Sequence, residues 1–177
     1  TQTTSTGSFL FKISVIKSLA QLRASFKHNR REIQKELGAK SHIDAQKICL
    51  NYSLSESVKT DDLIQRVKES IEVHEEQIRK RIRRDAVLAI EVLFSIPLAR
   101  HNINSDEYFK DCLEWTIEQF SPAFVLTADV HLDEATPHMH VILSCVTPNK
   151  LIGSKIKGNK ARYQERTDHF FHNVACK

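Results

Sequence analysis

The chain has 177 residues, of which 41% are hydrophobic and 27% charged, with only four glycines and four prolines. This composition is typical of a folded globular domain and excludes a long disordered or low-complexity segment. The length suits one domain and is short for two. No apolar run reaches the length of a membrane span, so we expect no membrane partner for this part of the protein.

Basic residues outnumber acidic ones by 26 to 22, and a net charge of +4 alone says little about partners. Their distribution is more informative, because they gather at residues 12–40, 79–84 and 150–166. Blocks of this kind favour a phosphate-binding surface. Any one block is equally compatible with a solvated charged face, so the blocks indicate nucleic acid only together with other evidence.

The four cysteines are widely spaced and form no C-x-x-C pair. This spacing indicates reduced thiols in a cytoplasmic protein. The chain begins at Thr1 rather than Met and ends at Lys177 within an expected helix. We therefore expect residues 1–177 to be a single domain taken from a longer protein.

The N-terminal part of the chain predicts a strand followed by a helix. Residues 9–16 have the alternating pattern of a strand with one buried face. Apolar residues at helical spacing follow over residues 19–37, with Gly38 as a natural cap. Residues 27–31 lie inside this helix or at a break in it, and residues 49–54 can form a strand or a loop arm.

A second helix is expected to begin at Asp61, a candidate N-cap, and carries His74 on its apolar face. We interpret His74 as a residue at the edge of the core rather than as a ligand. Residues 85–97 are nearly all apolar and predict a central strand. The helix after it has Ser105 or Asp106 as its expected cap.

Two more apolar runs, residues 123–130 and 139–146, are separated by a short polar stretch and predict an antiparallel strand pair. Residues 151–153 form a candidate edge strand, and the basic segment after them is expected to be helical. This order of elements predicts an α/β (α+β) fold in which helices flank a mostly antiparallel sheet.

The densest group of functional side chains lies between these two strands. Within residues 131–140 are three histidines and two carboxylates: His131, Asp133, Glu134, His138 and His140. His138 and His140 are two residues apart on a strand and so project from the same face, and the short connection can fold His131 back beside them. Unconnected surface histidines are the alternative, but such a cluster between strands seldom arises without a function.

Three converging imidazoles bind Mn²⁺, Zn²⁺, Fe²⁺, Co²⁺ or Ni²⁺ far better than Mg²⁺ or Ca²⁺, which prefer oxygen ligands. Three protein ligands also leave positions open for a substrate, as in catalytic sites. Asp133 or Glu134 could complete the ligand set, orient a histidine or accept a proton. We favour Glu134 near the metal and Asp133 as a turn residue or a support behind the ligands.

A cation with open positions polarises a phosphoryl or carbonyl oxygen for attack by a nucleophile. The basic blocks favour a phosphate substrate. Histidine and tyrosine both form covalent phospho-intermediates, so chemistry alone does not choose among His28, Tyr52, Tyr108 and Tyr163. The simplest interpretation of His28 by itself is a surface position on a charged helix.

Four segments resemble motifs of the Mob/Pre plasmid mobilisation relaxases, also called the MobV family. They occur in the family's order within residues 12–161, and the last is highly specific. The segments are residues 26–31 (FKHNRR), 50–54 (LNYSL), 83–87 (RRDAV) and 131–140 (HLDEATPHMH). In the last segment, residues 138–140 form the His-hydrophobic-His triplet that names the HUH endonuclease superfamily.

The resemblance implies a five-stranded sheet of HUH type and a relaxase that nicks one strand at an origin of transfer. The cut is a transesterification that leaves the protein covalently attached to the 5′ phosphate of single-stranded or hairpin DNA. The residue roles that it implies are His28 as nucleophile, Arg31 on the scissile phosphate, His131, His138 and His140 as ligands of Mn²⁺ or Mg²⁺, Glu134 in their support, and Lys27, Arg30, Asn51, Tyr52, Arg83 and Arg84 along the DNA.

Other functions are compatible with the same residues. An HUH-type transposase, a replication-initiation nickase or the relaxase of an integrating element would use the same metal fold. A non-catalytic DNA-binding accessory protein would use the histidines only to brace the sheet. A metal-dependent hydrolase of a small substrate would place them in a closed pocket. A covalent adduct with single-stranded DNA separates a nickase from the accessory protein.

Overall fold

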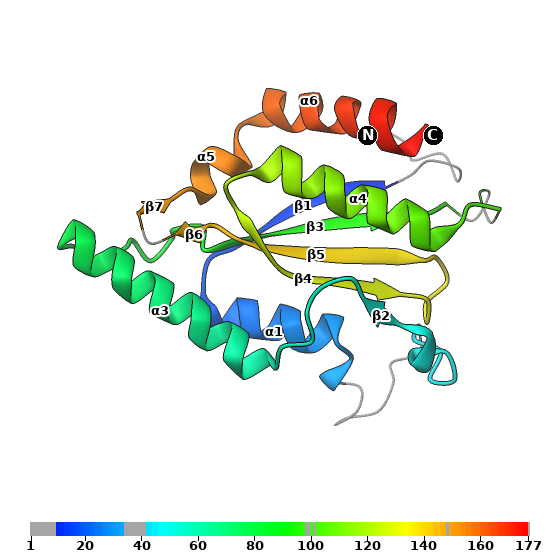
Figure 1. Cartoon of the computed structure of the whole chain (residues 1–177), viewed down its shortest axis with the longest axis horizontal. Coiled ribbons are helices and arrows are strands. Elements are labelled where there is room, and N and C mark those ends of the chain that lie inside the picture. The colour runs from blue at the N-terminus through cyan, green and yellow to red at the C-terminus, as the bar shows by residue number, and fades with distance from the viewer. Residues whose placement is uncertain (1–9, 34–41, 98–99, 101, 148, 177) are drawn as a thin grey trace.

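The computed structural model describes residues 10–33, 42–97, 100, 102–147 and 149–176. Its centre is a five-stranded sheet in the order β1-β3-β5-β4-β2 (Figure 1). The strands are β1 (Leu10–Ile16), β2 (Tyr52–Ser53), β3 (Ala89–Ser95), β4 (Phe124–His131) and β5 (His138–Ser144). All four pairings are antiparallel, so the expected fold class is confirmed.

Helices cover both faces of this sheet (Figure 1). One face carries α1 (Leu19–Asn29) and α3 (Thr60–Ile78). The other carries α4 (Ser105–Phe120), α5 (Gly153–Lys157), α6 (Lys160–Phe170) and a final π-helical turn (Phe171–Ala175). The expected helix with His74 is α3, and His74 is buried on its inner side.

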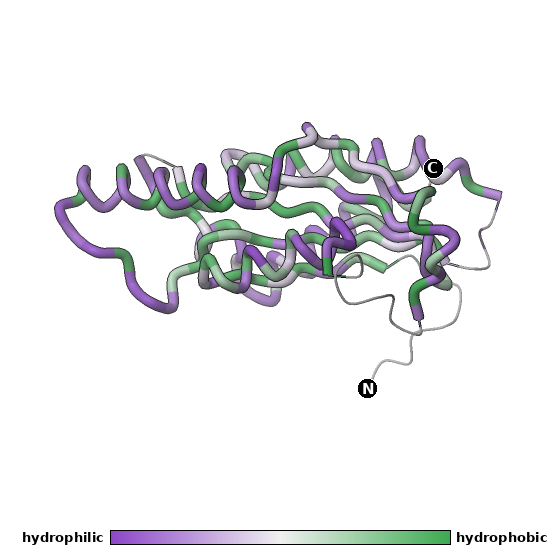
Figure 2. The backbone as a smooth tube through the Cα atoms, turned by 90° about the horizontal axis from the view of Figure 1, so that it is seen from below, coloured by the Kyte–Doolittle hydropathy of each residue, from purple (hydrophilic) through white to green (hydrophobic). Residues whose placement is uncertain are grey.

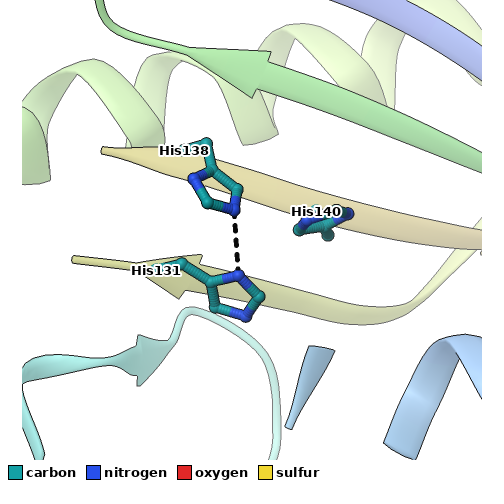
Figure 3. Close-up of side chains that lie close together, drawn as sticks. All are labelled: His131, His138 and His140. Atoms are coloured by element: carbon teal, nitrogen blue, oxygen red, sulfur yellow. Dashed lines mark hydrogen bonds between the residues drawn. The ribbon is translucent and has the colours of Figure 1, made fainter. Parts of the chain in front are cut away.

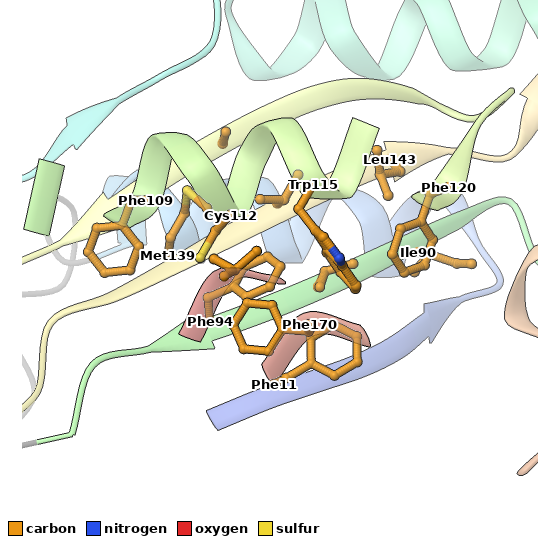
Figure 4. Close-up of a cluster of buried hydrophobic side chains, with 14 of the residues drawn as sticks. Phe11, Ile90, Phe94, Phe109, Cys112, Trp115, Phe120, Met139, Leu143 and Phe170 are labelled. Carbon is orange, nitrogen blue, oxygen red and sulfur yellow. The ribbon is translucent and has the colours of Figure 1, made fainter. Parts of the chain in front are cut away.

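Side-chain alternation along the strands separates two cores. Met139 and Leu143 of β5 project towards α4 into the larger core, where Phe94 and Trp115 also lie (Figure 4). Ile142 projects from the other face into the smaller core beneath α1 and α3. The rest of that second face is polar, because it carries the histidines of β4 and β5.

The first helix is shorter than its apolar pattern predicts. α1 ends at Asn29, and the N–H of Arg30 donates to the Phe26 carbonyl oxygen. Arg31 then takes a left-handed φ of 57°, and its side chain donates hydrogen bonds to the carboxylates of Asp133 and Glu134, which precede β5. Tertiary pairing therefore overrides helix propensity at this point. The expected cap Gly38 lies outside the described residues.

The next two helices begin slightly away from their expected caps. Lys59 occupies the cap position of α3, and Asp61 stands in the first turn, where its charge complements the helix dipole. α4 is capped by Asn104, whose side-chain oxygen accepts from the N–H of Asp106. Neither Ser105 nor Asp106 is the cap.

Two short segments also take definite structures. Residues 49–54 contain the end of a 3-10 helix (Ile48–Leu50) and then the edge strand β2. The expected edge strand at residues 151–153 is wrong for the main sheet. Instead, β7 (Lys150–Leu151) pairs with β6 (Val146–Thr147) as a separate two-stranded sheet. The Ser144 side chain accepts from the Val146 N–H, and the chain leaves the main sheet there.

The connection from α3 to β3 reaches beyond the end of the sheet and is strongly hydrophilic (Figure 2). Arg79 ends α3 with a left-handed φ of 51° and opens the basic block of residues 79–84. In the part of the chain that the structure describes, no helix has both the length and the apolar composition needed to cross a membrane.

Candidate active site

The three clustered histidines meet on one face of the sheet. His131 ends β4 and pairs with His138, the first residue of β5, and His140 lies two residues further along β5. Their ring centroids are 4.9, 5.1 and 5.2 Å apart (Figure 3). Antiparallel pairing and the two-residue period of a strand thus bring together the side chains that the sequence predicts as metal ligands.

Each ring is held through one nitrogen, which leaves the other for a ligand. The anchoring oxygens are Asn29 O, 2.6 Å from His131 Nε2, Thr136 O, 2.9 Å from His138 Nδ1, and Glu91 Oε1, 3.0 Å from His140 Nδ1. An acceptor oxygen requires a proton on the nitrogen that faces it. The nitrogens that remain are His131 Nδ1, His138 Nε2 and His140 Nε2, and the first two lie 3.0 Å apart, within hydrogen-bonding distance (Figure 3).

Burial keeps two of these imidazoles, those of His131 and His138, in the neutral form that binds metal. It lowers the pKa of His131 to about 3 and also lowers the pKa of His138. The candidate ligand atoms of the three residues lie within 4.8 Å of one another. Neutral nitrogen donors that converge in this way fit a divalent ion of the Mn²⁺ or Zn²⁺ type, and His131, His138 and His140 would hold it.

A buried arginine joins this cluster to the N-terminal part of the chain. Arg31 is 2% exposed and donates to both carboxylate oxygens of Asp133, at 2.9 and 2.7 Å. Its Nη2 also donates to Glu134 Oε1 at 2.6 Å and lies 3.2 Å from His131 Nδ1. Burial is the largest effect and raises the pKa of Asp133, but the hydrogen bonds and the charge of Arg31, together with the nearby Asn51 amide, hold this pKa below its ordinary value.

The two carboxylates therefore occupy different positions. Asp133 is fully buried and pairs with Arg31 behind the histidines. Glu134 is partly exposed and lies 3.9 Å from His138 Nε2. Both carboxylates lie close enough to His131 to form a second candidate ligand group with it, so the expected division between Glu134 and Asp133 stays a prediction.

His28 stands in the last turn of α1 and faces the cluster. Its ring centroid lies 6.2 Å from that of His140. Burial and the neighbouring His140 lower its pKa, so the ring is neutral near pH 7. A neutral imidazole is the nucleophilic form. The helix thus brings a candidate nucleophile beside the candidate ligands.

The three tyrosines of the chain lie elsewhere. Tyr52 pairs with Val130 and packs on the α4 side of the sheet, and burial raises its pKa to about 12. Tyr108 is buried in the same core, and the Tyr163 hydroxyl donates to the Phe11 carbonyl oxygen. His28 is therefore the one candidate nucleophile that the structure places at the histidine cluster.

Three of the predicted DNA-binding residues lie near this site. Lys27 precedes His28 in the last turn of α1. The guanidinium of Arg30 donates to the backbone carbonyl of Val58, and Asn51 accepts from the N–H that follows His131. These residues surround the end of α1 and the end of β4.

Arg83 and Arg84 lie at the other end of the sheet. They precede β3, whose last residue, Ser95, pairs with His138 and whose first residue, Ala89, lies six residues earlier in the same strand. A strand of this length spans about 20 Å. The structure does not bring these two arginines to the histidines.

Two acidic residues at the site were missed in the sequence. Glu91 accepts from both His140 Nδ1 and Asn29 Nδ2, each at 3.0 Å, and so links a candidate ligand to the residue after His28. Asp129 lies directly opposite His140 in the strand pairing. Burial raises the pKa of Asp129, and the nearby Arg30 offsets part of this effect. In the sequence, the signal that could have identified Glu91 and Asp129 was a carboxylate within an otherwise apolar strand.

Comparison with known proteins identifies the family. The family model Mob_Pre, described as "Plasmid recombination enzyme", matches residues 10–177. The chain belongs to this family. The resemblance of the four motifs to Mob/Pre proteins is thereby confirmed.

Curated relatives of this Mob/Pre chain have the same description. The chain is 28% identical over 170 residues to plasmid recombination enzyme type 1 of Staphylococcus aureus, an alignment that covers 91% of this chain and 40% of that protein. It is 30% identical over 138 residues to the plasmid recombination enzyme of Bacillus thuringiensis, with 73% of this chain and 28% of that protein covered. The chain thus spans less than half the length of both relatives.

Solved structures of a Mob/Pre protein have the same fold. The Mn-bound MobM relaxase domain with plasmid pMV158 oriT DNA (22 nt), at pH 5.5, aligns with a TM-score of 0.79 and 22% identity, over 94% of this chain and 85% of that chain. A complex with 26 nt oriT DNA aligns with a TM-score of 0.64.

Removal of the Glu91 side chain should weaken metal binding by this Mob/Pre chain. Glu91→Ala frees His140 to rotate, and we expect the affinity for Mn²⁺, measured by calorimetry, to fall about 10- to 100-fold. Glu91→Gln keeps an acceptor for His140 and should lose less. Glu118→Ala, an exposed position on α4, is the control. Equal affinities in Glu91→Ala and the control would contradict the role of Glu91.

The metal-free Mob/Pre chain should lose stability as the pH falls from about 6.5 to 3. In this window an unfolded His131 takes up a proton, whereas the folded chain, with a pKa of about 3 at this residue, does not. The folded state therefore loses about 3 to 5 kcal/mol through this one residue. Chemical denaturation in EDTA at several pH values measures the slope, which should be shallower in His131→Gln. Parallel slopes would contradict the prediction.

Proposed function

We propose that this chain is the relaxase domain of a longer Mob/Pre protein and that it nicks one strand of plasmid DNA at an origin of transfer. The observation that carries the proposal is the position of His28 beside three converging histidines. A nucleophile and a metal centre must reach the same phosphate for this chemistry. The two come from segments far apart in the chain and meet on the polar face of the sheet.

In the proposed reaction a neutral ring nitrogen of His28 attacks the phosphorus. A P–N bond forms, the P–O3′ bond breaks, and the 3′ oxygen leaves and takes up a proton from water. The 5′ phosphate stays on His28, ready for the reverse reaction. Arg31, held by Asp133, adds positive charge beside the phosphate, and Glu134 supports the ligands. A divalent ion, Mn²⁺ before Mg²⁺, supplies Lewis acidity when it is bound.

The proposed DNA path follows the basic residues. Lys27, Arg30 and Asn51 contact the strand near the nick, and Arg83 and Arg84 contact a more distant part of the backbone. Tyr52 is left out because its side chain packs on the opposite face. Support comes from the solved Mob/Pre relaxase domain, which is Mn-bound and carries oriT DNA.

The test is a nicking assay with a supercoiled plasmid that carries the DNA flanking the chain's own gene. With Mn²⁺ we expect open circles and a protein–DNA adduct that survives denaturation, and neither product in EDTA or with His138→Ala. A phosphohistidine linkage is cleaved by acid, unlike phosphotyrosine. An acid-stable adduct would move the nucleophile to a tyrosine. Binding without any adduct would favour a non-catalytic DNA-binding protein.

A further inference from the structure

A cavity of about 450 Å³ adjoins the histidine cluster. It lies between the end of α1 and the edge strand β2, which are neighbours in Figure 1. Asn29 and Arg31 line it and also contact His131, and Asp129 lines it directly opposite His140 in the strand pairing. The cavity therefore shares its inner wall with the candidate active site.

Two buried acceptor oxygens in this wall have no hydrogen-bond partner among the described residues. They are Asn29 Oδ1 and Asp129 Oδ2, in side chains that are 2% and 6% exposed. Two donors of the same lining, Arg31 Nη1 and Asn51 Nδ2, are also without a partner among these residues. Asn29 uses its amide nitrogen on Glu91, so only its oxygen is left. Ser53 and Thr127 lie beside Asp129 and help to lower its pKa, but the Ser53 hydroxyl donates to the Ala128 carbonyl oxygen. Buried acceptors without donors are costly, and they favour a ligand that brings N–H groups.

A phosphate alone does not satisfy this lining. Arg30 and Arg31 line the cavity together with Glu32, Glu56 and Asp129, so carboxylates outnumber cations, and a phosphate brings no N–H group to the Asn29 and Asp129 oxygens. A cavity of this volume suits one nucleotide rather than a larger group. Among the DNA bases, guanine presents two adjacent N–H donors, N1 and N2, to a carboxylate. Such charge-assisted paired bonds are stronger than single neutral ones.

We propose that this cavity holds one unpaired guanine base of the bound strand, with its N1 and N2 hydrogens on Asp129 and an additional contact to Asn29. The proposal rests on the proposed function, because it takes single-stranded DNA as the ligand. Proteins that select single strands commonly read such splayed-out bases by their Watson–Crick edges. The base would enter beside Arg30, which lies at the rim, while its neighbouring phosphate lies towards His28.

Fluorescence anisotropy with labelled nonathymidylates tests the proposal, with the central base as thymine, guanine, adenine, cytosine or hypoxanthine. All measurements contain EDTA, so neither metal binding nor nicking enters. We expect the guanine oligonucleotide to bind about tenfold more tightly than the thymine, adenine and cytosine ones. Hypoxanthine lacks the N2 amino group and should fall between. Equal affinities for all five oligonucleotides would overturn the proposal.

Asp129→Asn should remove the guanine preference, so that the guanine and thymine oligonucleotides bind with equal affinity, whereas the exposed control Asp62→Asn should keep the preference. A preference retained in folded Asp129→Asn would overturn the proposal, and so would a preference that requires added Mg²⁺. If Asp129→Asn fails to fold, the five oligonucleotides measured with the unmodified chain still test the proposal. A guanine preference in a chain that never nicks would leave the cavity proposal standing and refute the proposed function.

Discussion

Replacement of His28 by alanine should abolish nicking while DNA binding remains. His28 is the candidate nucleophile at the cluster, so its loss removes the group that forms the P–N bond. We expect the nicking rate with Mn²⁺ to fall by at least about a thousandfold. DNA affinity should change by less than about threefold, because one neutral ring makes a small share of the contacts with the backbone. Gel assays of nicking and anisotropy of binding measure the two effects.

Two control variants test whether the loss of nicking in His28→Ala is specific to this histidine. His172→Ala removes an exposed histidine near the C-terminal end, and Tyr52→Phe removes a hydroxyl that lies on the opposite face of the sheet. Both should nick at the unmodified rate. A Tyr52→Phe variant without adduct, or a His28→Ala variant that still nicks, would transfer the chemistry from histidine to tyrosine.

Replacement of Arg31 by methionine should destabilise the fold strongly. The change leaves the fully buried carboxylate of Asp133 without its cation. Removal of one partner from a buried ion pair costs about 3 to 5 kcal/mol. In a chain of this size the melting temperature should fall by about 10 °C. Calorimetry in EDTA measures the change without a contribution from metal.

A double variant distinguishes the stability lost with the ion pair from the stability lost with side-chain packing. Arg31→Met with Asp133→Leu removes both charges and should recover much of the lost stability. Arg23→Met breaks the exposed pair with Asp61 and should cost less than about 1 kcal/mol. Additive losses in the double variant would show that Arg31 and Asp133 stabilise the fold independently.

The histidine cluster could be predicted from sequence because its geometry is local. His138 and His140 share a strand face, and His131 reaches them across a short loop, so periodicity and turn length suffice. His28 could not be derived in this way, because it arrives through the docking of α1 on the sheet. Its own surroundings in the sequence indicate a charged surface helix, and only the Mob/Pre resemblance indicated otherwise.

The contacts that hold the site together were also beyond sequence patterns. Arg31 and Asp133 are 102 residues apart, and their pairing accompanies a break at residues 30–31 in a helix whose apolar spacing continues to residue 37. In the sequence, Glu91 is one polar residue in an apolar strand, and its contact with His140 cannot be read from that pattern. The sheet itself was predictable, because buried strands of this length have a strong alternating or continuous apolar pattern.

In the proposed relaxase, the position of the basic block, residues 79–84, limits how DNA can lie on the protein. The block stands beyond the first residue of β3, about 20 Å from the last residue of that strand, which pairs with His138. Successive base pairs of a duplex rise about 3.4 Å. A duplex that touches both places must therefore cover at least about six base pairs between them. The footprint of this domain would then extend to one side of the nick rather than being centred on it.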